Sequence, residues 1–154
     1  MEVKKILKIM NNFEYKKMKY YSERIEREIL CEGEYKGYKF YILNFGTHPT
    51  AYIKIPPQNK LFFKDYDDID NIDVHGGLTY SENYLFITED KKIKGWFIGW
   101  DYAHYGDYVS YLDTEGQFYH FLRMQGNKKG KKWTTKEILQ DCFSVIDQII
   151  ELGD

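Results

Sequence analysis

Histidines and aspartates gather in two short motifs in the middle of the chain. His75 is followed by a glycine pair, and Asp101, His104 and Asp107 recur every three residues after a hydrophobic run. Glycine lets a backbone approach a ligand closely, and a strand end that leads into a polar loop is a common place for functional side chains. If the two motifs fold together, they form a site with two imidazoles and two carboxylates.

Such a set supports three kinds of chemistry. Imidazoles and carboxylates bind divalent metals, an aspartate can orient a histidine for general acid–base catalysis, and the same groups can hydrogen-bond a polar ligand. Aspartate and histidine in loops also cap helices or bind backbone amides, which is the structural alternative. The candidate catalytic residues are His75, Asp101, His104 and Asp107. The candidate ligand-binding residues are His48, His75, Gly76, Gly77, Thr79, Trp100, Asp101, Tyr102, His104, Tyr105, Asp107 and Arg123.

Aromatic and basic residues flank the second motif. The aromatic residues are Trp96, Trp100, Tyr102, Tyr105 and Tyr108. Their rings can stack on bases and sugars, or they fill the core, which is favoured for Trp96 and Trp100. The one basic cluster comprises Arg123, Lys128, Lys129, Lys131 and Lys132. It permits an anionic, nucleotide-sized ligand, although a charged run is usually a solvated loop.

Composition narrows the class of protein. The 154 residues carry 22 Lys+Arg and 24 Asp+Glu, so no global basic field exists to hold bulk nucleic acid. The 15 Tyr, 10 Phe and 3 Trp make 18% of the chain, which excludes disorder and favours a β-rich domain. The two cysteines do not suffice for a disulfide framework or a cysteine zinc site. With neither a membrane span nor a signal peptide, we expect a cytoplasmic protein.

Periodicity predicts the elements that must position the motifs. Residues 1–27 are predicted to form an amphipathic helical arm, and residues 28–154 a single domain. Glycine at Lys36-Gly37 predicts a hairpin turn. The predicted strands are residues 29–35, 38–45, 51–55, 84–88 and 95–101. Residues 58–73 and 102–132 are predicted loops.

The last predicted element is a helix that packs on the core. Thr134 and Glu137 have capping-box spacing, and Gly153 is a candidate C-cap. The predicted apolar stripe is Ile138, Leu139, Cys142, Val145, Ile146, Ile149 and Ile150. The predicted fold class is therefore α+β: a mainly antiparallel sheet with a C-terminal helix packed on it and an N-terminal helical arm.

The two motifs resemble a family of small, largely uncharacterised proteins of bacteriophage and prophage genomes. The family pattern reads HGGLTY, then an aromatic strand, then Gly-Phe-Asp-Cys-Ala-His-x-Gly-Asp, and it is similar to residues 75–80 and 99–107 here. The upstream segments at residues 46–48 and 52–56 are also similar, so the resemblance covers about residues 32–113. Tyr102 stands where the family usually has cysteine, which excludes a thiol role at that position.

The phage setting implies a category of function. Small phage proteins with a preformed pocket often oppose host defence, so the resemblance implies sequestration of a nucleotide-like immune signal in the host cytoplasm. The alternative is a metal-assisted phosphodiesterase that acts through His75, Asp101, His104 and Asp107, with a divalent metal as cofactor. A second alternative is a protein-binding inhibitor in which both motifs are structural. No membrane partner is expected, and homo-oligomerisation stays open.

Overall fold

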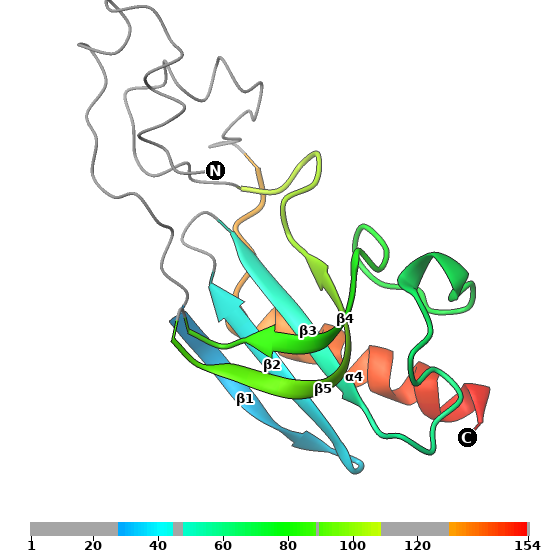
Figure 1. The fold of residues 1–154 in the computed structure, drawn as a ribbon. Helices are drawn as coiled ribbons and strands as arrows, with labels where there is room; N and C mark the ends of the chain where they lie inside the picture. The colour runs from blue at the N-terminus through cyan, green and yellow to red at the C-terminus, as the bar shows by residue number, and fades with distance from the viewer. Residues whose placement is uncertain (1–27, 45–47, 89, 109–129, 154) are drawn as a thin grey trace, which may run out of the picture.

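An antiparallel sheet and one long helix make up the described part of the chain, residues 28–44, 48–88, 90–108 and 130–153 of this computed structural model (Figure 1). The strand order is β1-β2-β3-β5-β4. The strands are β1 (Glu28–Tyr35), β2 (Tyr38–Asn44), β3 (Pro49–Ile55), β4 (Tyr80–Phe86) and β5 (Lys92–Asp101). The helix is α4 (Thr135–Leu152), and a short 3₁₀ helix, η1, covers Tyr66–Asp68. The α+β class is confirmed, whereas the predicted arm at residues 1–27 lies outside the described residues.

The first hairpin follows from its turn residues. Lys36 and Gly37 have φ angles of 50° and 87°, and positive φ at both central positions is typical of a type I′ turn. This turn matches the twist of paired strands, so Tyr35 pairs with Tyr38 and the ladder continues to Glu28 and Asn44. The predicted hairpin is therefore confirmed over its described residues.

The fourth strand differs from its predicted position. It begins at Tyr80 and ends at Phe86 rather than covering residues 84–88, and β5 begins at Lys92 rather than at residue 95. The reason is that β4 lies at the edge of the sheet. An edge strand tolerates polar residues such as Ser81 and Glu82, because pairing with β5 rather than apolar alternation defines it. The apolar pattern therefore marked only its second half.

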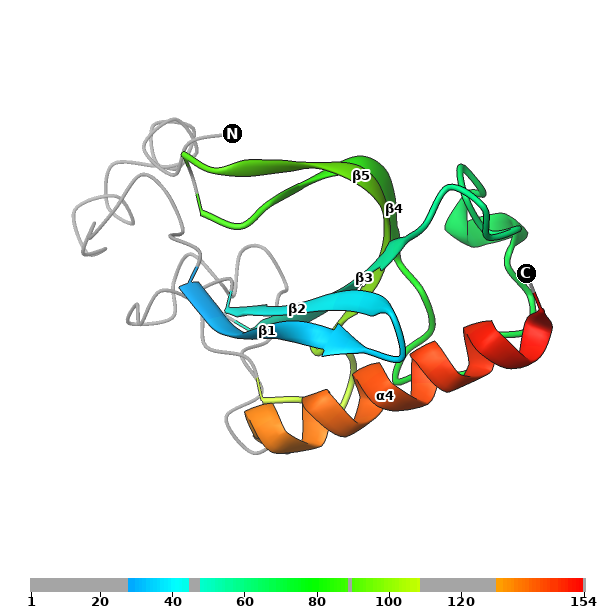
Figure 2. The same cartoon turned by 90° about the horizontal axis from the view of Figure 1, so that it is seen from below.

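Apolar side chains fill both faces of the sheet. Figure 2 shows α4 along one side of β1 and β2, with the β4–β5 hairpin curving over the other side. The cluster that includes residues of α4 contains Ile42, Ile53, Ile98, Trp100, Ile138 and Ile146. The cluster on the opposite face contains Tyr41, Leu43, Tyr52, Leu85, Ile87 and Phe97. Neighbouring residues of β5 face opposite sides of the sheet, since Ile98 and Phe97 belong to different clusters.

Helix α4 begins and ends where its caps predict. The Thr134 side chain accepts a hydrogen bond from the Glu137 backbone N–H, the Glu137 side chain accepts from the Thr134 backbone, and Gly153 is the C-cap. The Lys131 ammonium, followed by the Thr134 backbone N–H, lowers the pKa of Glu137 to about 2. The predicted apolar stripe is correct except at Ile150, which is 40% exposed. Among the described residues, no helix is long and apolar enough to cross a membrane.

Loss of the N-cap should weaken α4 measurably. We expect Thr134→Ala to lower the free energy of unfolding by about 1 kcal/mol. The substitution removes the hydroxyl that accepts from the Glu137 backbone N–H and donates to the Glu137 carboxylate. Urea denaturation measures the difference. Thr134→Ser keeps the hydroxyl and serves as the control, so an equal loss in both variants would contradict the capping explanation.

Candidate functional site

The two histidine motifs meet at one end of the sheet. Asp101 ends β5 and pairs with Thr50 at the start of β3, and the Thr79 backbone N–H donates to the carbonyl of Gly99 just before β4 begins. The segment after β5 also runs beside the segment that leads into α4 (Figure 1), where Asp107 forms a β-bridge with Lys131. Three strand ends and the approach to α4 therefore surround one small region.

Asp107 is the buried centre of this region. It is 2% exposed, and its Oδ2 atom lies 2.7 Å from His75 Nε2. The same oxygen accepts a hydrogen bond from the His104 backbone N–H at 2.9 Å. Its Oδ1 atom accepts from Trp133 Nε1 at 2.9 Å. One carboxylate therefore joins both motifs to the segment before α4.

The charge state of Asp107 determines which nitrogen of His75 carries the proton. Burial alone raises the pKa of Asp107, but hydrogen bonds from His75, the His104 backbone and Trp133 outweigh it and hold that pKa below its usual range. The carboxylate is therefore ionised at neutral pH and only accepts hydrogen bonds. His75 must donate through Nε2–H, which leaves the Nδ1 lone pair on the neutral ring.

The second histidine lies beside the other carboxylate. His104 Nε2 is 3.2 Å from Asp101 Oδ1, but this buried atom makes no hydrogen bond within the described residues. Asp101 is held by hydrogen bonds from the Thr79 hydroxyl at 3.0 Å and the Ala103 backbone at 3.1 Å. The ring centroids of His75 and His104 are 5.6 Å apart. The predicted convergence of the two motifs is confirmed.

The two glycines after His75 differ in what lies beside them. Gly76 has a φ of 70°, and a Cβ atom there would overlap the ring of His104 at Nε2. Gly77 has a φ of 80°, and the space around its Cβ position is open. Both glycines allow the turn, but only Gly76 allows a close approach. The sequence predicted that the backbone approaches a ligand; the structure places His104 against it.

Two aromatic side chains predicted to contact ligand are buried. Trp100 and Tyr102 are 1% and 0% exposed, so neither ring face is open for stacking. Tyr102 instead stacks on His75 at 5.0 Å and 7°, and its hydroxyl donates to Asp141 at 2.6 Å. Burial, followed by that hydrogen bond, raises the pKa of Tyr102 far above its usual value. The core position favoured for Trp100 is confirmed, whereas Tyr102, predicted to contact a ligand, instead fills the core against His75.

The remaining predicted residues have different positions. His48 is close enough to interact electrostatically with Asp101 and Asp107, and Tyr105 is fully exposed. Arg123 lies outside the described residues, as does most of the basic cluster. Lys131, however, forms the bridge to Asp107 and Lys132 follows it, so the backbone of both lysines lies next to the site.

Acid should weaken the fold through His48. Burial lowers the pKa of His48 below its ordinary 6.5, against the opposing effect of Asp101 and Asp107. The unfolded chain therefore binds a proton at His48 more readily than the folded chain does. The folded state has its full stability above pH 6.5 and loses stability as the pH falls through the lowered pKa of folded His48. Between about pH 7.5 and about pH 5, we expect the urea-measured free energy of unfolding to fall less in His48→Gln than in wild type. An identical fall would contradict this assignment.

Sequence reasoning missed three residues that support the site. Trp133 binds Asp107, and Asp141 binds Tyr102. Gly130 lets the basic segment pass the backbone of Asp107, which a Cβ atom would overlap. Trp133 directly precedes the N-cap, where an apolar residue is explained by a hydrophobic staple. Its place in the sequence therefore gave no sign that it also binds Asp107. For Gly130, the available signal was its place inside a run of lysines, where a glycine can indicate a close backbone approach.

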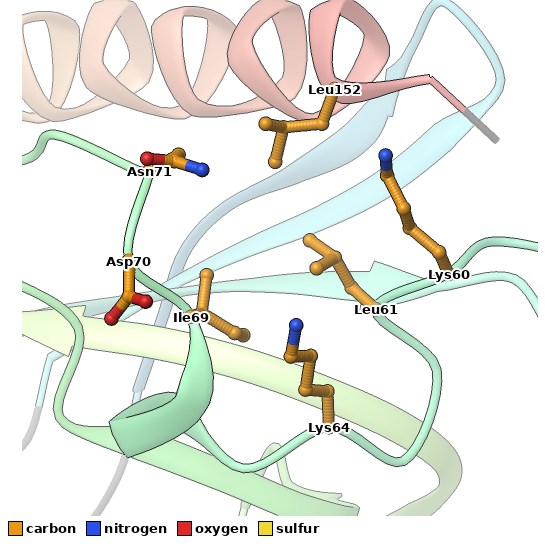
Figure 3. Close-up of a pocket in the computed structure, with 7 residues that line it drawn as sticks. All are labelled: Lys60, Leu61, Lys64, Ile69, Asp70, Asn71 and Leu152. Atoms are coloured by element: carbon orange, nitrogen blue, oxygen red, sulfur yellow. The ribbon is translucent and has the colours of Figure 1, made fainter.

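The described residues contain no group of three His, Cys, Asp or Glu side chains arranged to hold a metal ion. The donors instead form two His–Asp pairs, His75 with Asp107 and His104 with Asp101. A pocket with about 370 Å³ of empty space, which includes open solvent, lies near the end of α4 (Figure 3). None of the predicted site residues line it. Its lining is Lys60, Leu61, Lys64, Ile69, Asp70, Asn71 and Leu152.

Comparisons with family models, curated proteins and solved structures found no match to this chain.

Proposed function

We propose that the protein binds a small anionic, nucleotide-like ligand at the His75–His104 site. The observation that carries the proposal is the meeting of two partly exposed imidazoles with the basic segment Lys131–Lys132, which bridges to Asp107. The side chains of His75 and His104 are 24% and 33% exposed, so part of each ring is accessible. Ammonium groups donate hydrogen bonds to phosphate oxygens, and the Nδ1 lone pair of His75 would accept a hydrogen bond from a hydroxyl or N–H group of the same nucleotide.

Two lysines lie on the segment beside Asp107. Asp107 already accepts three hydrogen bonds and is buried, so the protein itself compensates most of its charge. Lys131 pairs with Glu137 at 2.7 Å and lies 3.9 Å from the centre of the Trp133 ring. Lys132 lies 5.2 Å from the centre of the Tyr108 ring. Tyr105 is fully exposed, so its ring is accessible to a ligand.

The resemblance to phage proteins extends the proposal to a biological role. The ligand would be a nucleotide messenger of host immunity, and tight binding without cleavage would remove it from its receptor. This extension depends on the resemblance, and the direct test is chemical. Purified protein is mixed with cyclic mononucleotides and cyclic dinucleotides, separated from free ligand, and denatured by heat. Intact ligand in the supernatant supports sequestration, and failure to bind any of these nucleotides contradicts it.

Matched variants connect binding to the site. His75→Gln keeps a donor toward Asp107 but removes the imidazole, and we expect it to weaken binding by about tenfold or more. Lys36→Gln removes a cation at the β1–β2 turn, where Lys36 pairs with Asp147, and should leave affinity unchanged. Titration calorimetry measures both. Equal affinity in His75→Gln and wild type would remove His75 from the ligand site.

A second candidate function is hydrolysis of a phosphodiester. The observation that favours it is the His75–Asp107 pair, because a carboxylate that fixes the Nε2–H tautomer leaves Nδ1 to act as a base. One imidazole would take a proton from water as its oxygen attacks phosphorus. The other, as imidazolium, would protonate the leaving oxygen as the P–O bond breaks. Altered nucleotide after incubation identifies this activity, and its loss on adding a chelator would indicate a metal.

A further inference from the structure

Trp133 contacts the candidate site from a segment that neither motif includes. Its Nε1–H donates to Asp107 Oδ1 at 2.9 Å, and its ring centroid lies 4.7 Å from that of His75 and 5.2 Å from that of Tyr102. His75 therefore has Tyr102 stacked on one ring face and the tilted Trp133 ring close by. Trp133 thus contacts both the imidazole and the carboxylate bound to it, as His104 does through its ring and its backbone N–H.

The two carboxylate oxygens of Asp107 accept hydrogen bonds from different partners. Oδ2 accepts from His75 and from the His104 backbone. Oδ1 accepts from Trp133, which prevents the carboxylate from rotating about its Cβ–Cγ bond. Without this donor, a buried carboxylate oxygen would lack its described partner, and buried polar groups strongly favour an arrangement that satisfies them. The carboxylate would then rotate and its bond to His75 would weaken.

We infer that Trp133 is a positioning residue for His75, acting through Asp107. It fixes the Nε2–H tautomer of His75 and the orientation of the ring, so that Nδ1 is the nitrogen available to a ligand. The consequence for ligand binding rests on the proposed function, whereas the positioning itself does not. Because Trp133 adjoins Lys132 and precedes the N-cap of α4, it also ties the basic segment to the imidazole.

The inference is tested in the ligand-free protein. In ¹H–¹⁵N spectra of the histidine rings, wild-type His75 should be a single tautomer with the proton on Nε2. Trp133→Phe keeps an aromatic ring but removes the donor, so we expect mixed tautomers and exchange of the Nε2–H proton with water about tenfold faster or more. Trp96→Phe is the matched control. It also removes an indole hydrogen bond, from Trp96 Nε1 to the carbonyl of Lys64, but away from the site.

An unchanged tautomer and exchange rate in Trp133→Phe would overturn the inference. If that variant does not fold, wild-type protein still decides the matter. The Trp133 indole proton should exchange at least about tenfold more slowly than that of half-buried Trp96, whose hydrogen bond to the Lys64 carbonyl is exposed, and equal rates would overturn the inference. Nucleotide binding is measured separately. If the spectra change as expected but wild type binds no nucleotide, only the proposed function fails. If wild type binds and Trp133→Phe matches it in tautomer and affinity, only the positioning role fails.

Discussion

Asp107→Ala is expected to lower the free energy of unfolding by about 3–5 kcal/mol. The side chain is 2% exposed and accepts from His75, the His104 backbone and Trp133. Removing it leaves these donors without their acceptor in a region with little water, and each unsatisfied buried group is costly. Because small domains are stable by about 5–15 kcal/mol, the loss would be a large part of the total. Urea denaturation at neutral pH measures it.

A second carboxylate provides the control for this prediction. Asp147 pairs with Lys36 at 2.8 Å, and their side chains are 43% and 54% exposed. Exposed pairs contribute about 0–1 kcal/mol, so Asp147→Ala should have a small effect. If both variants lose the same stability, Asp107 does not hold the two motifs together. Asp107→Asn should lose most of the same stability, because its amide nitrogen is a donor that faces other donors.

Gly76→Ala should have the second large effect, on both stability and the site. The left-handed backbone at this position costs a non-glycine residue about 1–2 kcal/mol. The added Cβ atom also overlaps the ring of His104, and overpacking of this kind costs about 1–3 kcal/mol more. We therefore expect a larger destabilisation than backbone strain alone produces. We also expect weaker nucleotide binding, because His104 must move away from Asp101.

The adjacent glycine separates the two causes. Gly77 has a similar φ of 80°, but the space around its Cβ position is open. Gly77→Ala should therefore cost only the backbone strain of about 1–2 kcal/mol and leave the His104 ring signals unchanged. Denaturation curves and histidine ring spectra of both variants make the comparison. Equal stability loss and unchanged His104 signals in both would show that the ring does not pack on Gly76.

The parts of the fold that could be predicted depend on short-range chemistry. The turn at Lys36-Gly37 requires positive φ, and the helix start at Thr134 requires a capping hydroxyl with Glu137 three residues later. Alternation along β5 likewise assigns Phe97 and Ile98 to opposite faces. These signals lie within a few neighbouring residues, so no knowledge of distant partners is needed. The start of β4 at Tyr80 lacked such a signal, since pairing across the sheet edge defines it.

The candidate site was predictable in composition but not in geometry. The motifs indicated that His75, Asp101, His104 and Asp107 act together, and the structure brings them together. Residue types did not show that Tyr102 is buried beneath His75 rather than open to a ligand. A tyrosine beside a polar loop is compatible with either position. Only the packing of α4, which places Asp141 at the Tyr102 hydroxyl, decides between them.

The sequence by itself determined which functional groups are available and which local turns and caps form, because these depend on residues close together in the chain. Tertiary structure decided which groups touch. His75 and Asp107 are 32 residues apart, and Asp107 and Trp133 are 26 apart. Their contacts require the ends of β3, β4 and β5 and the start of α4 to meet, which depends on how both faces of the sheet bury their apolar side chains. Periodicity records which face a side chain occupies, but it does not record its distant neighbour.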